Sequence, residues 1–168
     1  MDAGLLLGRL VLGGLMAAHG AQKAFGWFGG YGLAGTGGFF EQIGFRPGRL
    51  FAATAAATEI AGGLLLAAGL LTPIAAALVV SVMIVAAVSV HWPQGVFAQN
   101  NGIEVPLLYG VGGAALALTG PGAFSLDAAL GLEAFWTPTV VLASLAIGVL
   151  GAVGNLAIRR PALVARSS

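Results

Sequence analysis

Six ionisable side chains stand inside or at the ends of long apolar stretches of this 168-residue chain. They are Arg9, His19, Lys23, Glu59, His91 and Glu104. His19 and Lys23 are four residues apart, so on a helix they share one face, with Gln22 adjacent. A histidine, a lysine and a carboxylate that meet in apolar surroundings can hydrogen-bond a polar headgroup and exchange protons with it. Whether they meet depends on the elements that carry them.

Five apolar stretches supply those elements: residues 4–25, 50–71, 73–92, 103–120 and 138–158. Each is near the ~20 residues that a helix needs to cross ~30 Å of hydrocarbon, and the fourth is at the short limit. The composition agrees, because 58% of the residues are apolar and only 8% are charged, against roughly 25% charged in soluble domains. We predict an all-α, polytopic membrane helical bundle.

The composition also excludes several functions. The chain has no cysteine, which removes disulfides, thiol redox chemistry and Cys-ligated clusters. A net charge of +1 does not support a nucleic-acid partner. Residues 30–35 match G-x-G-x-x-G, but a dinucleotide site needs a preceding strand, and here an apolar helix precedes the motif. Two histidines without carboxylates at ligand spacing are weak evidence for haem or metal. We expect no haem, metal or nucleotide, so any redox role would need a borrowed cofactor.

Antiparallel packing should gather most of the ionisable set in one half of the bundle. The turn GLLTP around residues 69–73 is so short that the second and third stretches must be antiparallel neighbours. At ~1.5 Å per residue, Glu59 lies within about 2 Å of the centre of its stretch, and His19 lies about 7 Å from the centre of the first. We expect one side of the bundle to hold His19, Lys23, Glu59, His91 and Glu104, and the other to hold Arg9.

Each of these residues also has a purely structural interpretation. Glu59 can simply neutralise Lys23 or Arg9 so that the helices pack. His91 can be an interfacial anchor, and Glu104 at a helix start gains from the helix dipole. Arg9 can extend to the outer interface.

The basic residues predict the orientation. Lys23, Arg46 and Arg49 flank the first loop, and the tail carries Arg159, Arg160 and Arg166. With five spans, both regions lie on one side, which the positive-inside rule assigns to the cytoplasm, with the N-terminus outside. A four-span alternative, with residues 138–158 on the surface, would separate the two basic regions. The first stretch has no positive segment before it, so we expect it to be retained rather than cleaved.

The loop of residues 26–49 is rich in glycine and aromatic residues, which suggests a structured interfacial loop. FFEQIG, residues 39–44, could form a short amphipathic helix in the headgroup region. If the ionisable set binds a ring-shaped ligand, we expect that ligand to enter among Phe25, Trp27 and Phe28.

Several segments resemble the DoxX family of small bacterial membrane proteins. They are residues 9–44, 58–77, 90–108 and 118–127, and the first contains the string H-G-x-x-K-x-F-G-x-F-G-G from His19 to Gly30. The resemblance implies a four-helix membrane domain, which we place over residues 1–130. We expect a linker and an additional transmembrane helix over residues 131–158 and a basic tail over 159–168, and the resemblance does not account for the added helix. The motif positions of the family would fall on His19, Lys23, Glu59, His91 and Glu104.

The resemblance implies a subunit of a quinone-linked redox system in the bacterial inner membrane, since relatives include a subunit of a thiosulfate:quinone oxidoreductase. Glu59, His19 and Lys23 would be catalytic. The quinone headgroup would be bound by His19, Lys23, Trp27, His91 and Glu104. Electrons would come from a partner such as a soluble oxidoreductase. The alternatives are a non-catalytic scaffold for soluble oxidoreductases and a small proton-coupled transporter, and the sequence leaves both catalysis itself and a homo-oligomer open.

Overall fold

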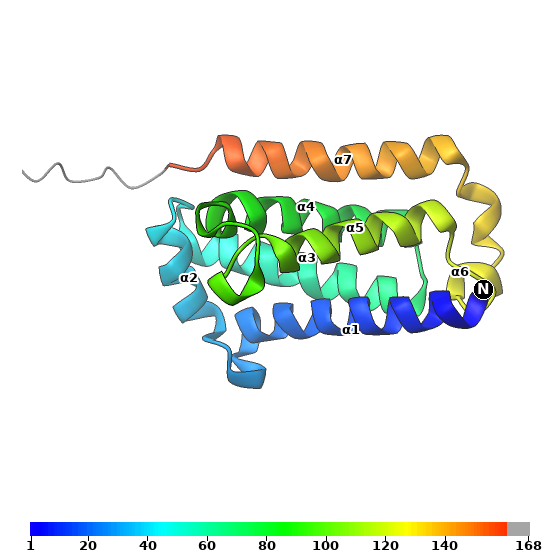
Figure 1. The fold of residues 1–168 in the computed structure, drawn as a ribbon, viewed down its shortest axis with the longest axis horizontal. Helices are drawn as coiled ribbons and strands as arrows, with labels where there is room; N and C mark the ends of the chain where they lie inside the picture. The colour runs from blue at the N-terminus through cyan, green and yellow to red at the C-terminus, as the bar shows by residue number, and fades with distance from the viewer. Residues whose placement is uncertain (161–168) are drawn as a thin grey trace, which may run out of the picture.

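The computed structural model describes residues 1–160, and within that range the chain is helical without a strand. Five helices run back and forth beside one another (Figure 1): α1 (Asp2–Phe25), α3 (Gly48–Ala68), α4 (Thr72–Ala86), α5 (Glu104–Thr119) and α7 (Pro138–Ala157). Helix α2 (Gly32–Gln42) lies across one end of the bundle, and the short α6 (Leu126–Ala129) lies at the other. A π-helical turn, Ala87–His91, continues α4, and single 3₁₀ turns cover Trp27–Gly29, Trp92–Gln94, Ala98–Asn100 and Leu132–Phe135. The predicted all-α bundle is confirmed.

Four of the described helices are long and apolar enough to cross a membrane: Asp2–Phe25, Gly48–Ala68, Thr72–Gln94 and Pro138–Ala157. Helix α5 is apolar but has 16 residues, so it reaches about 24 Å at 1.5 Å per residue. This helix corresponds to the predicted stretch of residues 103–120, which was already at the short limit for a span. The chain is therefore a multi-pass membrane protein with four long spans and one short apolar helix beside them.

Glycines bring α1 and α3 into close contact. A Cβ added to Gly13 would lie 2.5 Å from the carbonyl oxygen of Gly63, and one added to Gly63 would lie 2.5 Å from the nitrogen of Ala17. Small residues allow such an approach between membrane helices, where packing replaces the hydrophobic effect as the source of association. The buried core between α1, α3, α4 and α5 consists of Met16, Leu66, Ala75, Val79, Met83, Tyr109 and Leu116.

Helix α7 packs on the outside of this four-helix core, along α4 (Figure 1). A Cβ on Gly148 would lie 2.5 Å from the carbonyl oxygen of Ala77, so the two backbones touch there. The predicted architecture, a four-helix core with an added fifth helix, is confirmed.

The end of α7 is joined to the loop that follows α2. The backbone N–H of Arg160 donates to the carbonyl of Gly44 at 2.9 Å, and the Nε of Arg159 donates to the carbonyl of Ile43 at 2.6 Å. Arg159 and Arg160 therefore share one end of the bundle with the loop that carries Arg46. The four-span alternative does not fit these contacts. Arg166 and the rest of the predicted tail after residue 160 lie outside the described residues.

The region between α1 and α3 is more helical than the glycine content predicts. Helix α2 begins at Gly32 rather than at Phe39, and it buries Thr36 and Gly37. A Cβ on Gly37 would lie 2.9 Å from the Cγ of Arg49, so the packing of α2 against the start of α3 depends on this glycine. The G-x-G-x-x-G match, residues 30–35, therefore follows a 3₁₀ turn and continues into α2, and no strand precedes it within residues 1–29.

Candidate functional site

A cavity of about 380 Å³, here called the inner cavity, lies between α1, α3, α4 and α5 near the end that carries α2. Its volume falls within the roughly 300–1,000 Å³ typical of small-molecule sites. Most of its wall is apolar, including Phe39, Phe40, Val82, Met83, Val85, Val105 and Pro106. Its polar lining residues are His19, Lys23, Glu59, Ser89, His91, Asn101 and Tyr109. Four of the predicted site residues thus meet around one space.

Glu59 and Lys23 form a buried ion pair at this cavity. The Nζ of Lys23 donates to the Oε1 of Glu59 at 2.7 Å and to its Oε2 at 2.5 Å. The Glu59 side chain is 2% exposed and that of Lys23 is 28% exposed. The pair forms where α1 and α3 approach closely, because Gly20 leaves room for the backbone of Ala56. The sequence left Lys23 and Arg9 as possible partners of Glu59, and in the structure the partner is Lys23.

His19 is held in one tautomer by its own helix. Its Nδ1 lies 3.1 Å from the Oε1 of Gln22, and the Nε2 of Gln22 donates to the carbonyl of Phe28 at 3.2 Å. Because an amide oxygen only accepts, Nδ1 of the neutral ring carries the hydrogen and Nε2 is the acceptor. The ring stands edge-on to Tyr109, with 5.9 Å between the ring centroids.

His91 has the same tautomer on the opposite wall. Its Nδ1 lies 2.7 Å from the carbonyl oxygen of Asn101, which can only accept, so Nε2 of the neutral ring is again the acceptor. His91 ends the π-helical turn Ala87–His91, a local widening of the helix that is frequent at functional sites. The inner cavity therefore contains two imidazoles with defined donor and acceptor nitrogens.

Trp27 and Glu104 do not line the inner cavity. Trp27 is 59% exposed, because α1 ends at Gly26, whose φ of 73° turns the chain away. Its ring packs on Phe25, with 4.9 Å between the centroids. The Oε2 of Glu104 accepts a hydrogen bond from the N–H of Ala98 at 2.7 Å. Glu104 thereby shapes the loop that supplies the partner of His91.

A second buried polar cluster, which contains Arg9 and Asp127, lies at the other end of the bundle. Arg9 is fully buried, and its Nη2 donates to the carbonyl of Phe124 at 2.5 Å. It does not extend to the outer interface, because Gly69 leaves space for the guanidinium inside the bundle. Asp127 is also fully buried and accepts hydrogen bonds from Leu71 and Thr72.

Sequence reasoning missed the role of Asp127 because its partners are far away in the chain. The only local signal was Ser125, whose Oγ accepts a hydrogen bond from the N–H of Ala128 and so begins α6. That cap predicts a short helix but says nothing about burial of the carboxylate two residues after it.

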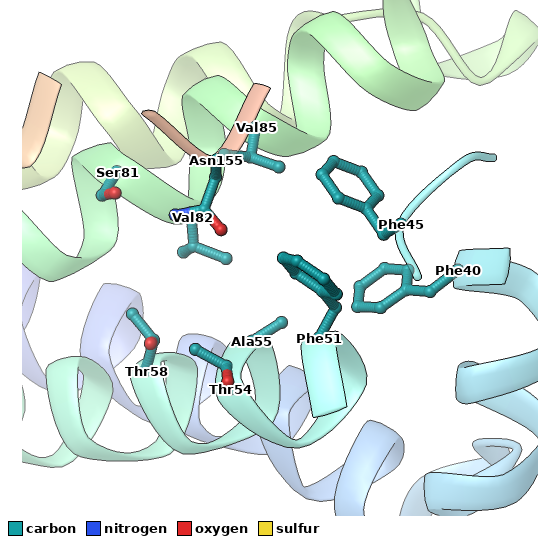
Figure 2. Close-up of a pocket in the computed structure, with 10 residues that line it drawn as sticks. All are labelled: Phe40, Phe45, Phe51, Thr54, Ala55, Thr58, Ser81, Val82, Val85 and Asn155. Carbon is teal, nitrogen blue, oxygen red and sulfur yellow. The ribbon is translucent and has the colours of Figure 1, made fainter. Parts of the chain in front are cut away.

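A smaller space of about 70 Å³ adjoins the inner cavity (Figure 2). Phe40, Phe45 and Phe51 gather at one end of it, and Asn155 of α7 closes another side. Two of its polar groups bond to their own helices: Asn155 Nδ2 donates to the carbonyl of Gly151 at 3.0 Å, and Thr54 Oγ1 donates to that of Leu50 at 3.0 Å. This space is a packing gap between the core and α7.

Comparison with known proteins identifies a family. The DoxX family model matches residues 4–92, which is more than half of the chain. The matched range includes the four predicted site residues that line the inner cavity, and it ends before α5 and α7. No curated protein matches, and no solved structure matches.

Proposed function

The chain belongs to the DoxX family, and on that basis we propose that it is a subunit of a quinone-linked redox system that binds the quinone headgroup in the inner cavity. The observation that carries the proposal is the composition of that cavity. Apolar walls surround a lysine–glutamate pair and two histidines in a space of about 380 Å³. A quinone headgroup is a flat apolar ring with polar oxygens at its edge, and it requires this combination of walls and a few polar groups.

The residues present fit such a ring. The Nζ of Lys23 has three hydrogens and uses two on Glu59, which leaves one donor for a carbonyl oxygen. The Nε2 atoms of His19 and His91 accept a hydrogen bond from a hydroxyl, and each donates one to a carbonyl when its ring is protonated. A bound quinone supplies an acceptor for two electrons and two protons.

The protein contributes proton handling and orientation. Lys23 Nζ can pass a proton to the carboxylate of Glu59 along their hydrogen bond, and this transfer leaves two neutral groups. The pair can therefore hold a proton at either member beside the cavity. The chain has no cysteine for a thiol or iron–sulfur centre, so in this proposal the electrons come from a partner protein.

The proposed orientation follows the basic residues. Lys23, Arg46, Arg49, Arg159 and Arg160 belong to the end of the bundle that carries α2, and we place this end at the cytoplasmic face of the bacterial inner membrane. The N-terminus then lies outside. Single cysteines introduced by Ala3→Cys and Arg160→Cys should react with an impermeant thiol reagent from opposite sides of the membrane.

Binding of a short-chain benzoquinone to the purified protein in quinone-free nanodiscs tests the function. We expect saturable binding, at least ten-fold weaker in Glu59→Gln and in His19→Ala. Glu133→Gln is the matched control, because Glu133 is exposed and lies outside the inner cavity. Circular dichroism and thermal unfolding would verify that each variant is folded.

Two outcomes would refute this function. One is the absence of saturable binding to the unaltered protein, tested with a naphthoquinone as well. The other is equal binding to the unaltered protein and to folded Glu59→Gln and His19→Ala. Co-purification of a soluble oxidoreductase that survives both substitutions, without quinone binding, would instead identify the chain as a scaffold.

A further inference from the structure

A second cavity, about 620 Å³, lies between the end of α1, the turn Trp27–Gly29 and α2; it is here called the outer cavity. The side chains of Gln22, Lys23, Thr36 and Gln42 line it together with four glycines. It is larger than the inner cavity and more polar in the residues that surround it.

Glycines on one face of α2 create this space. Tyr31, Gly35, Gly38 and Gln42 all line the outer cavity, and their spacing of four, three and four residues places them on one side of the helix. A Cβ on Gly38 would meet no atom within 4 Å, so no close backbone approach requires a glycine there. Glycine inside a helix is less stable than alanine. Gly38 therefore weakens the helix and gains no packing contact, and its effect is to leave the cavity open.

The inner and outer cavities meet at two residues, Lys23 and Phe39, which line both. Glu59 lines only the inner cavity and is 2% exposed, whereas the Lys23 side chain is 28% exposed. The ion pair thus connects a deeply buried carboxylate to the outer cavity.

The charges around the outer cavity favour water as its content. Lys23 is its one charged lining residue, and the carboxylate of Glu59 already neutralises it. The remaining polar side chains are amides and hydroxyls, which hydrogen-bond water well and offer no net charge to an ion.

We propose that the outer cavity is the aqueous route by which protons reach the Lys23–Glu59 pair. A proton passes from Lys23 Nζ to the carboxylate of Glu59, and Nζ then regains a proton from a hydronium ion in the water of the outer cavity, which is left as a neutral water molecule. The net change is one proton moved from that water to Glu59. The use of this proton rests on the proposed quinone function, but the existence of the route does not.

The test uses thiol accessibility, because the chain has no cysteine of its own. One probe is Glu59→Cys. The second is Lys23→Cys with Glu59→Gln, which leaves no unpaired charge at the site. Leu66→Cys is the control, since Leu66 is fully buried on the same helix and lines neither cavity. A small, charged methanethiosulfonate reagent that does not enter lipid would be added to the protein in proteoliposomes.

We expect both probes to react at least ten-fold faster than Leu66→Cys. Filling the outer cavity by Gly38→Trp with Gln42→Trp should slow both reactions at least five-fold. Gly154→Trp on α7, where a Cβ also meets no atom within 4 Å, should leave the rates unchanged.

Reaction rates of folded probes no faster than that of Leu66→Cys would overturn the route, and so would rates unaffected by filling the outer cavity. The two proposals separate when quinone binding is measured on the unaltered protein and thiol reactivity on the cysteine probes. If quinone binds but the cysteine probes do not react, or react at rates that do not change when the outer cavity is filled, the quinone site is retained and the proton route is rejected. If the cysteine probes react, and filling the outer cavity slows them, but no quinone binds, the proton route is retained and the quinone function is rejected.

Discussion

Oδ2 of Asp127 accepts hydrogen bonds from both the backbone N–H and the hydroxyl of Thr72, at 2.9 Å and 2.7 Å. Oδ1 of the same carboxylate accepts from the N–H of Leu71 at 2.8 Å. Asp127 thus caps α4 from a segment that follows α5, and its negative charge lies at the positive end of the helix dipole. The bundle therefore has two buried carboxylates, Asp127 at one end and Glu59 near the middle of α3, and each is bound by a segment that is distant in the sequence.

Replacing Asp127 should destabilise the bundle without touching the inner cavity. In Asp127→Ala, two backbone N–H groups at the start of α4 lose their acceptor, and we expect a loss of about 3 kcal/mol in unfolding free energy. Thermal unfolding in detergent would measure it. Glu133→Ala, at an exposed acid, should stay within about 0.5 kcal/mol of the unaltered protein. An equally small change in Asp127→Ala would show that these hydrogen bonds do not hold α4.

The Lys23–Glu59 pair should show strong energetic coupling. Lys23→Met leaves the Glu59 carboxylate buried without a partner, which costs about 3–5 kcal/mol when a pair is broken in a protein interior. Lys23→Met with Glu59→Gln removes both charges, so the loss should be smaller than the sum of the two single losses by about 1–3 kcal/mol. A double-mutant cycle on unfolding measures this difference. Additive losses would mean that the two side chains do not interact.

Two glycine-to-alanine substitutions should have opposite effects on stability. Gly63→Ala places a methyl group 2.5 Å from the backbone nitrogen of Ala17, and such overpacking costs about 1–3 kcal/mol. Gly38→Ala meets open space and should stabilise α2 by up to about 1 kcal/mol through helix propensity. Melting temperatures of the two variants, compared under one condition, provide the readout. A stabilising Gly63→Ala would contradict the close contact of α1 with α3.

The position of α7 on α4 can be tested by an engineered disulfide. A Cβ on Gly151 would lie 3.5 Å from the Oγ of Ser81, which is compatible with disulfide geometry. Ser81→Cys with Gly151→Cys should therefore cross-link under mild oxidation, and mass spectrometry of proteolytic fragments would identify the bond. Ser81→Cys with Gly154→Cys is the control and should remain reduced. Cross-linking only in the control pair would mean that α7 is rotated about its axis.

The sequence was sufficient to predict the elements that are long and uniformly apolar. The stretch of residues 138–158 corresponds to α7, and that of residues 4–25 corresponds to α1, within two residues at each end. Hydrophobic length is a local property, so no tertiary contact is needed to identify a span. The same reasoning predicted the start of α2 less well, because glycine lowers helix propensity. The packing of Thr36 and Gly37 against α3 compensates for that low propensity, and it is not visible in the sequence.

For the candidate site, the sequence identified the ionisable side chains that are costly to bury in a bilayer. The depth of each in its helix also predicted that His19, Lys23, Glu59 and His91 belong to one half of the bundle. Only the tertiary structure decided that Lys23 rather than Arg9 pairs with Glu59, that Trp27 and Glu104 stand outside the inner cavity, and that Asp127 is buried. Depth follows from counting residues along a helix at a fixed rise. A partner depends on how each helix is rotated and where two helices touch, and in this protein those contacts are set by glycines such as Gly20 and Gly69, whose neighbours lie far away in the chain.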